Sequence, residues 1–261
     1  MSLLNQVENR DQNSVPVVRM NVQGTDGVGK STFGAGAESP IFIQAEDGLS
    51  YIDVPRFPLC NTWNEILDCV ESVANEQHNY KTVVLDTTDR ASSLCQQHAC
   101  EQNGWKSIET PGFGKGFTAE KEYWQKLLDG FDFCIRKGIN VILLSHVQEK
   151  TFNDPEREPY DRWTMRCPKG VNALIKDWVD FNFFASYETN TVKEGSNKAR
   201  AVSFGNRALF TKFAAAYDAK SRIELPDKID FTWDSFYAHY TQALAARGTT
   251  QTQQVNKEAK A

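Results

Sequence analysis

The chain has 261 residues, of which 40% are hydrophobic, 11% aromatic and 24% charged, and its formal net charge is −5. This composition is typical of a globular protein that can bury a core without disulfides or a structural metal. It excludes a membrane-spanning helix, because no apolar run approaches the roughly 18 residues that a span needs, and it excludes a surface that is basic throughout. The amino terminus has no basic start followed by an apolar stretch, and the six cysteines then read as reduced thiols, so we expect a cytoplasmic protein.

The first part of the chain alternates apolar runs with helical patterns, after a polar tail expected over residues 1–14. Strands are predicted over residues 17–22, 41–45, 82–86 and 140–145, and helices over residues 30–36, 62–77, 90–101 and 119–137. Thr62 and Glu65 form a capping box at the start of one helix, and Gly138 suits the end of another. The continuous apolar runs TVVLD and NVILLS are typical of strands buried on both faces.

The rest of the chain changes character. Loops are predicted over residues 104–117 and 147–170. Strands are expected over residues 181–187, 201–204 and 207–211, and a GSNK turn joins the first two. A closing helix is expected over residues 233–246. Strands that alternate with helices and are followed by antiparallel strands predict an α/β fold with a mostly parallel sheet. We expect one domain, residues 15–246, followed by a flexible tail over residues 247–261.

The strongest motif is GTDGVGKST, which fits G-x-x-x-x-G-K-[ST] between a predicted strand and a predicted helix. Glycines let backbone N–H groups turn around phosphate oxygens, and the following helix presents its positive end to the same anion. Lys30 would reach the β- and γ-phosphates of a nucleotide, and the Ser31 hydroxyl would bind Mg²⁺. The position of the motif between a predicted strand and a predicted helix disfavours the alternative, a glycine-rich turn with only a structural role. The predicted nucleotide site comprises Gly24, Thr25, Asp26, Gly27, Val28, Gly29, Lys30, Ser31 and Thr32.

Three further polar residues follow predicted strands. Asp86 ends TVVLD, where a carboxylate can hold the metal rather than cap the next helix. Glu46 follows IFIQA and is positioned to orient or deprotonate the attacking water, with Asp47 as the fallback and a solvated turn as the alternative. His146 follows NVILLS and would sense the γ-phosphate; the alternative is an ordinary histidine at a strand end.

Cys95, His98 and Cys100 form a C-x-x-H-x-C cluster. Zinc needs about four ligands, and no second pair lies close in the sequence. The same stretch has a helical pattern, so no structural metal is predicted there.

In this order the motifs resemble the RecA-type ATPase core: a P-loop, a strand-end glutamate (IFIQAED), a strand-end aspartate (VVLDTTD) and a strand-end polar sensor (ILLSH). The sensor in that family is usually Gln, where this chain has His146. More closely, the chain resembles phage-encoded ATP-binding proteins that carry only the RecA core, some of which are single-strand annealing recombinases. The similarity covers most of residues 16–225, and the GFGKGF and KDWVD stretches narrow it to the phage group.

The resemblance implies a RecA-like P-loop NTPase fold, with helices on both faces of the sheet and an antiparallel C-terminal extension. It also implies a homo-oligomer, a ring or a filament, with ATP at the subunit interfaces. Related ATPases place a K-x-R pair against the neighbour's γ-phosphate, and Lys220 and Arg222 have that spacing. A surface basic pair is the alternative, and Arg207 is a weaker candidate for the same role.

Two predicted loops leave the ligand edge of the sheet, and each mixes aromatic with basic residues that could stack bases and neutralise phosphates. Residues 147–170 carry no net charge, whereas residues 187–222 carry +4. The alternative is that these loops are solvated and that their aromatic residues only pack against the core. The prediction of nucleic-acid binding therefore depends on the resemblance to the phage group. The candidate nucleic-acid contacts are Trp105, Phe113, Lys115, Phe117, Lys150, Arg162 and Arg166.

Together, the motifs and the resemblance predict an ATPase with ATP and Mg²⁺ that acts on single-stranded DNA in phage recombination or replication, by annealing or strand exchange. The expected partners are single-stranded DNA, further copies of the chain and a single-strand-binding protein, and no membrane. Two alternatives remain open. One is a P-loop small-molecule kinase, and the other is a nucleotide-gated DNA-binding module that does not hydrolyse ATP.

Overall fold

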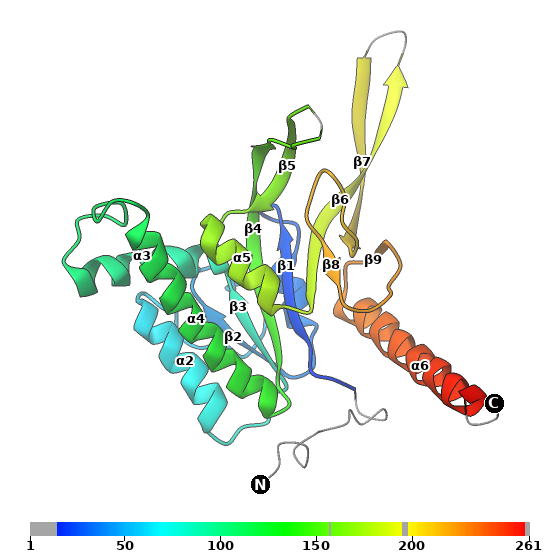
Figure 1. Ribbon diagram of the computed structural model, residues 1–261, viewed down its shortest axis with the longest axis horizontal. Helices are drawn as coiled ribbons and strands as arrows, with labels where there is room; N and C mark the ends of the chain where they lie inside the picture. Colours follow the sequence, from blue (N-terminus) through cyan, green and yellow to red (C-terminus); the bar gives the residue numbers. More distant parts are fainter. Residues whose placement is uncertain (1–14, 157, 195–197, 259–261) are drawn as a thin grey trace.

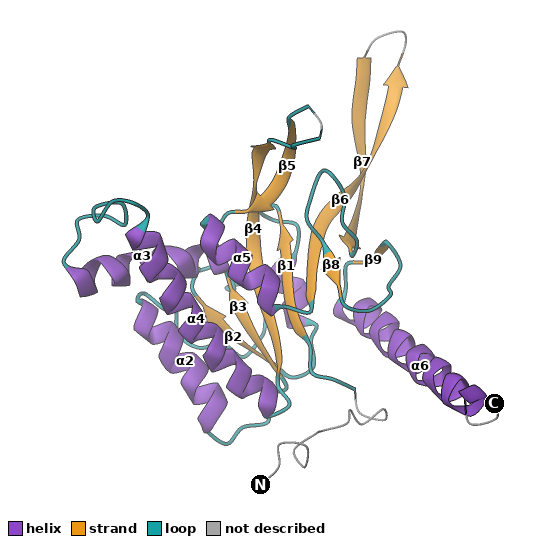
Figure 2. Ribbon diagram, viewed as in Figure 1, coloured by secondary structure: helices purple, strands orange, loops and turns teal. Residues whose placement is uncertain are grey.

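The computed structural model describes residues 15–156, 158–194 and 198–258. Within these residues the chain forms one mixed sheet with helices on both faces (Figures 1 and 2). The strands are β1 (Arg19–Gly24), β2 (Pro40–Gln44), β3 (Thr82–Asp86), β4 (Asn140–Phe152), β5 (Tyr160–Met165), β6 (Phe181–Glu194), β7 (Lys198–Phe210), β8 (Lys220–Ser221) and β9 (Lys228–Asp230). The helices are α1 (Lys30–Ala35), α2 (Trp63–Asn75), α3 (Thr88–Asn103), α4 (Lys115–Arg136), α5 (Lys169–Trp178) and α6 (Trp233–Glu258).

The centre of the sheet is parallel, in the order β2-β3-β4-β1-β6, and the later strands β7, β8 and β9 extend it antiparallel. Its register aligns the carboxyl ends of the parallel strands. Gly24 lies beside His146, and Gln44 lies beside Asp86. Residues that immediately follow these strands therefore meet at one edge of the sheet.

Two hydrophobic layers sandwich the sheet. On β3, Val83 and Leu85 pack into the layer under α2, α3, α4 and α5, whereas Val84 packs into the layer with α1 and α6. Successive strand residues point to opposite faces, so a strand that is covered on both sides must be apolar throughout. The predicted fold class is confirmed: a mostly parallel α/β sheet with helices on both faces and an antiparallel C-terminal extension.

Several predicted elements agree closely with the structure. β3 spans the predicted residues, α1 begins at Lys30, and Thr62 and Glu65 form the capping box of α2, in which the Glu65 backbone N–H donates to Thr62 Oγ1 over 3.2 Å. Gly138 has a φ of +82° after the end of α4, as expected of a helix C-terminal glycine. Local signals of this kind depend on neighbouring residues alone.

The predicted loop over residues 147–170 is wrong. β4 continues to Phe152 and pairs antiparallel with β5, and α5 begins at Lys169. The outer part of this hairpin is largely exposed, from Glu149 to Phe152. It therefore lacks the alternation of apolar and polar residues by which a half-buried strand is recognised.

The C-terminal third also differs from the prediction. The three expected strands are two long ones, β6 and β7, which form one hairpin, and residues 195–197 of the expected turn lie outside the described residues. α6 continues to Glu258, where a tail was expected from residue 247. Residues 247–258 contain no proline that would stop the helix, and extending a helix that has already formed avoids the cost of nucleation. The expected tail at residues 1–14 lies outside the described part of the chain.

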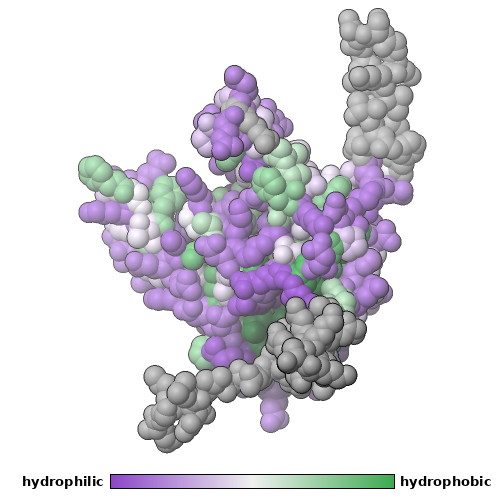
Figure 3. All heavy atoms as spheres, turned by 45° about the vertical axis from the view of Figure 1, so that its right-hand side comes forward, coloured by the Kyte–Doolittle hydropathy of each residue, from purple (hydrophilic) through white to green (hydrophobic). Residues whose placement is uncertain are grey.

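The surface in Figure 3 is predominantly hydrophilic, with small scattered hydrophobic patches. Two large side chains, Tyr51 and Phe113, are nevertheless fully exposed. In the part of the chain that the structure describes, no helix combines the length and apolar character required to span a bilayer.

Candidate nucleotide site

The P-loop connects the carboxyl end of β1 to the first residue of α1. Gly29 precedes this helix with a φ of +104°, a conformation that residues with a side chain rarely adopt. A Cβ atom on Gly24 would lie 2.6 Å from the Ala185 carbonyl oxygen of β6. Both glycines are thus required by the backbone itself, and the buried Val28 anchors the loop in the core.

Ser31 and Asp86 lie together as predicted. Ser31 Oγ donates a hydrogen bond to Asp86 Oδ2 over 2.6 Å, and Asp86 is buried. Burial raises the pKa of the Asp86 carboxyl, although the hydrogen bond from Ser31 and the charge of Lys30 oppose this. A bound cation would stabilise the ionised form of such a carboxylate.

A hydroxyl and a carboxylate are oxygen ligands of the kind that Mg²⁺ binds in nucleotide sites. Within the described residues, His, Cys, Asp and Glu side chains nowhere gather in threes that could hold a metal by themselves. A divalent cation between Ser31 and Asp86 would thus need further ligands from phosphate and water. This is the usual coordination of Mg²⁺ in a nucleotide complex, so the residues fit the ion.

Lys30 is buried inside the loop that precedes it. Its Nζ donates to the carbonyl oxygens of Gly24 and Thr25, over 3.1 and 2.9 Å. Burial lowers the pKa of the ammonium group, whereas the nearby Asp26 and Asp86 raise it. The lysine is held against the P-loop backbone, where the phosphates of a nucleotide bind.

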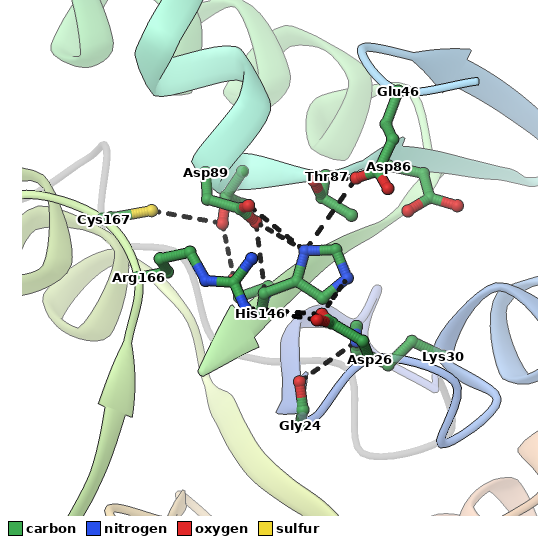
Figure 4. A network of polar contacts seen from close by, with 12 residues as sticks. Gly24, Asp26, Lys30, Glu46, Asp86, Thr87, Asp89, His146, Arg166 and Cys167 are labelled. Carbon is green, nitrogen blue, oxygen red and sulfur yellow. Dashed lines mark hydrogen bonds and ion pairs between the residues drawn. The ribbon is translucent and has the colours of Figure 1, made fainter. Parts of the chain in front are cut away.

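Glu46 follows β2 and reaches the same site (Figure 4). Thr87 Oγ1 donates to Glu46 Oε2 over 3.1 Å, and His146 Nδ1 lies 3.9 Å from the same oxygen. The carboxylate is 46% exposed, so water can reach it. It therefore has both a fixed orientation and access to solvent, which a base acting on water requires.

The imidazole of His146 lies between two carboxylates. Nδ1 is 3.1 Å from Asp89 Oδ1, and Nε2 is 3.1 Å from Asp26 Oδ1 (Figure 4). Burial raises the pKa of Asp89, but hydrogen bonds and charge from His146 outweigh it and hold that pKa at about 2. The ionised Asp89 fixes the orientation of the ring toward the P-loop.

These residues line one cavity of about 310 Å³. It brings together most of the predicted site, which consists of side chains and backbone from four separate segments: Asp26, Gly27, Gly29, Lys30, Ser31, Thr32, Glu46, Asp86 and His146. The sequence reasoning missed Thr87 in this lining and did not assign Asp89 to the site. Both stand in VVLDTTD beside the predicted Asp86, so their position in the chain was an available signal.

Lys220 and Arg222 lie elsewhere. β8 pairs with the first residues of β6, at the amino ends of the parallel strands, whereas the P-loop follows the carboxyl end of β1. Lys220 Nζ donates to the carbonyl oxygens of Lys176 and Val179 over 2.7 and 2.8 Å, and Arg222 Nε lies 2.9 Å from Asp180 Oδ1. Contact with a neighbouring subunit would require both side chains to exchange these partners.

Arg207, the weaker candidate, is the one that approaches the P-loop. Its Nη1 donates to the Val28 carbonyl oxygen over 3.1 Å. A Cβ atom on Gly29 would lie 2.2 Å from the same nitrogen, so this guanidinium rests directly on the loop.

A second cavity, of about 600 Å³, adjoins the nucleotide site. Asp89 lines it and bonds to His146, which lines the first cavity. Three predicted nucleic-acid contacts meet here with Lys169: Phe117, Lys150 and Arg166.

The other predicted nucleic-acid contacts lie outside this cavity. Trp105 and the fully exposed Phe113 belong to the segment between α3 and α4, and Lys115 is the first residue of α4. Arg162 is buried: its guanidinium lies near the rings of Phe152 and Phe213 and pairs with Asp218 over 3.0 Å. Because Arg162 is buried and already paired with Asp218, it is poorly placed to bind a phosphate.

Comparison with known proteins places the chain in a family. A family model described as an AAA domain matches residues 17–223. No curated protein sequence matches the chain. Among solved structures, the flagellar accessory protein FlaH from Methanocaldococcus jannaschii is similar at 10% sequence identity, over 82% of this chain and 85% of that chain, with a TM-score of 0.39.

Proposed function

The chain belongs to the AAA domain family of P-loop ATPases, and from this premise we propose that it binds Mg-ATP and hydrolyses it while acting on single-stranded DNA. The observation that carries the proposal is the 2.6 Å contact between Ser31 and Asp86, in one cavity with Lys30 and Glu46. The carboxyl ends of three strands, β1, β2 and β3, position these groups, and each has a distinct chemical task.

The residues divide the reaction among them. Lys30 binds oxygens of the β- and γ-phosphates, and the P-loop backbone holds the rest of the phosphate chain. Ser31 and Asp86 hold Mg²⁺, which neutralises charge on the phosphates when it is bound. Glu46 orients a water molecule and accepts its proton as the water oxygen attacks the γ-phosphorus and the bond to ADP breaks.

The DNA part of the proposal is supported by the second cavity. Lys150, Arg166 and Lys169 supply positive charge there, and Phe117 supplies an aromatic face. Single strands bind through such a combination of phosphate neutralisation and base stacking. The resemblance of GFGKGF and KDWVD to the phage group supports a role in phage recombination or replication, in a homo-oligomer.

The experiment is an ATP turnover assay with and without single-stranded DNA, on the wild type and on Glu46→Gln. We expect turnover that rises with DNA, and a variant that binds ATP but turns it over at least ~100-fold more slowly, as is typical of a lost general base. Equal turnover in the two proteins would refute the role of Glu46. Negligible turnover in both would favour the nucleotide-gated module, and phosphoryl transfer to a small molecule would favour the kinase.

A further inference from the structure

The wall between the two cavities contains a cation that the reaction described above does not use. Arg166 follows β5, and its backbone N–H donates to the His146 carbonyl oxygen over 2.8 Å. Its Nη2 lies 3.4 Å from Asp26 Oδ2 and 3.5 Å from Oδ1 (Figure 4). Asp26 belongs to the P-loop and lines the nucleotide cavity, so the guanidinium of Arg166 reaches the rim of that cavity.

This ion pair is easily exchanged. Arg166 is 44% exposed and Asp26 is 67% exposed, and contacts at 3.4–3.5 Å are long for hydrogen bonds. Exposed pairs of this kind contribute little stability, because water screens the charges and ordering two side chains costs entropy. A phosphate group carries more charge than a carboxylate and accepts two parallel N–H bonds from a guanidinium, so it competes well for Arg166.

The charge around the cavity makes such an exchange favourable. Asp26, Glu46 and Asp86 all line it, and each would repel a phosphate. Lys30 is the cation inside the loop, and Asp26 competes with any bound phosphate for cations at the rim. Asp26 is shared between His146 and Arg166. His146 Nδ1 lies 3.9 Å from Glu46, beside which the terminal phosphate must lie for attack by water.

We propose that Arg166 binds the terminal phosphate of the nucleotide from within the same chain, in exchange for its ion pair with Asp26, and so makes the site prefer a triphosphate to a diphosphate. The inference rests on the proposed binding of Mg-ATP. It assigns to Arg166 a task at the nucleotide that does not depend on nucleic acid. Arg207 is not equivalent to it, since Arg207 contacts a backbone carbonyl rather than an exchangeable acid.

The test measures nucleotide affinity rather than turnover. A fluorescent ADP is displaced from the full chain, in Mg²⁺ and without DNA, by ADP or by an ATP analogue that cannot be hydrolysed. The proteins are the wild type, Arg166→Gln, Arg166→Lys and Asp26→Asn. The matched control is Arg136→Gln, because Arg136 stacks on Phe133 near the end of α4, away from both cavities. Thermal melting checks that each variant is folded.

We expect Arg166→Gln to weaken binding of the ATP analogue about tenfold or more, the usual effect of losing a charge-assisted hydrogen bond, with ADP binding unchanged. Arg166→Lys should retain part of the preference, because it keeps the charge but loses the two-pronged contact. Asp26→Asn should strengthen binding of the ATP analogue, because it removes both a repelling charge and the competing partner of Arg166.

Equal losses for both nucleotides in Arg166→Gln, no loss for either, or weaker binding of the ATP analogue in Asp26→Asn would overturn the inference while leaving the proposed function intact. A wild type that binds neither nucleotide would refute the proposed function, and the inference would fall with it.

Discussion

The two ends of the parallel sheet carry similar charges but use them differently. At the amino end of β6, Asp180 accepts two hydrogen bonds from Arg19 over 3.0 Å and pairs with Arg222. At the carboxyl edge, Asp86 is buried with its pKa raised, and the pair of Asp26 with Arg166 is exposed and long. Charges at the first end hold the chain together, whereas charges at the second are free to exchange their partners for a ligand. The comparison teaches that incomplete pairing, rather than charge itself, marks the candidate site.

The largest expected effect tests the carboxyl edge. Lys30→Ala should abolish ATP turnover, because it removes the cation that binds the β- and γ-phosphates. The fold should survive, because the substitution removes only two hydrogen bonds, from Lys30 Nζ to the carbonyl oxygens of Gly24 and Thr25. Burial already disfavours the charged form of this lysine and lowers its pKa, so removing the charge should cost little stability. Turnover and thermal melting measured on the same preparation check both parts. Normal turnover in this variant would remove the P-loop from the mechanism.

Glu120 on α4 is a buried carboxyl for which the described part of the chain provides no ion pair. It accepts hydrogen bonds from Gln96, and burial raises its pKa to about 7. Because this pKa exceeds the ordinary value of 4.5, its contribution to stability is fully present below pH 4.5 and is lost as the pH rises toward 7.

Between pH 4.5 and 8 the ionisation of Glu120 should lower the free energy of unfolding of the wild type by about 3 kcal/mol, and the Glu120→Gln variant should not show this decrease. The measurement is urea unfolding of wild type and variant at several pH values. Parallel stability curves for the two proteins would show that Glu120 is ionised without penalty.

Removing the ion pairs of Asp180, at the amino end of β6, should lower stability without changing nucleotide binding. Asp180→Ala leaves Arg19 and Arg222 without their shared partner, so we expect the free energy of unfolding to fall by about 1–3 kcal/mol. Nucleotide affinity should stay within twofold of wild type. A stable variant that has lost nucleotide binding would reverse the assignment of roles to the two ends.

The smallest effect concerns the second cavity. Lys150→Gln should weaken binding of single-stranded DNA several-fold and lower the salt dependence of binding by about 0.7 in log–log slope, as expected for one lost phosphate contact. The matched control is Lys137→Gln, at the opposite end of the sheet after α4. Fluorescence anisotropy at several salt concentrations gives both quantities. Equal effects of the two substitutions would exclude a specific contribution of Lys150.

The site was more predictable from the sequence than the C-terminal half of the fold. The sequence predicts that Lys30, Ser31 and Asp86 lie together, and the structure brings them into one cavity. The P-loop motif and a buried strand depend on a few adjacent residues, and parallel strands bring their ends to one edge of the sheet. The hairpin of β4 and β5 was missed because its outer residues are exposed and show no periodic pattern. Pairing between distant strands is a tertiary property.

The roles of Arg162 and Arg166 could not be separated from the sequence either. Both are arginines of one predicted loop, yet Arg162 is buried against Asp218 while Arg166 reaches the P-loop. Their different environments arise from partners more than fifty residues away in the chain, Asp218 for Arg162 and Asp26 for Arg166. Spacing within one loop contains no information about such partners.

The most direct test of the account measures how Mg²⁺ changes the affinity for a non-hydrolysable ATP analogue in the wild type, Ser31→Ala and Asp86→Asn. Calorimetric titration with and without Mg²⁺ gives this ratio for each protein. We expect Mg²⁺ to strengthen binding in the wild type at least ~10-fold and both variants to lose most of this gain. An undiminished gain in both variants would contradict it, because the metal would then lie somewhere other than between these two oxygens.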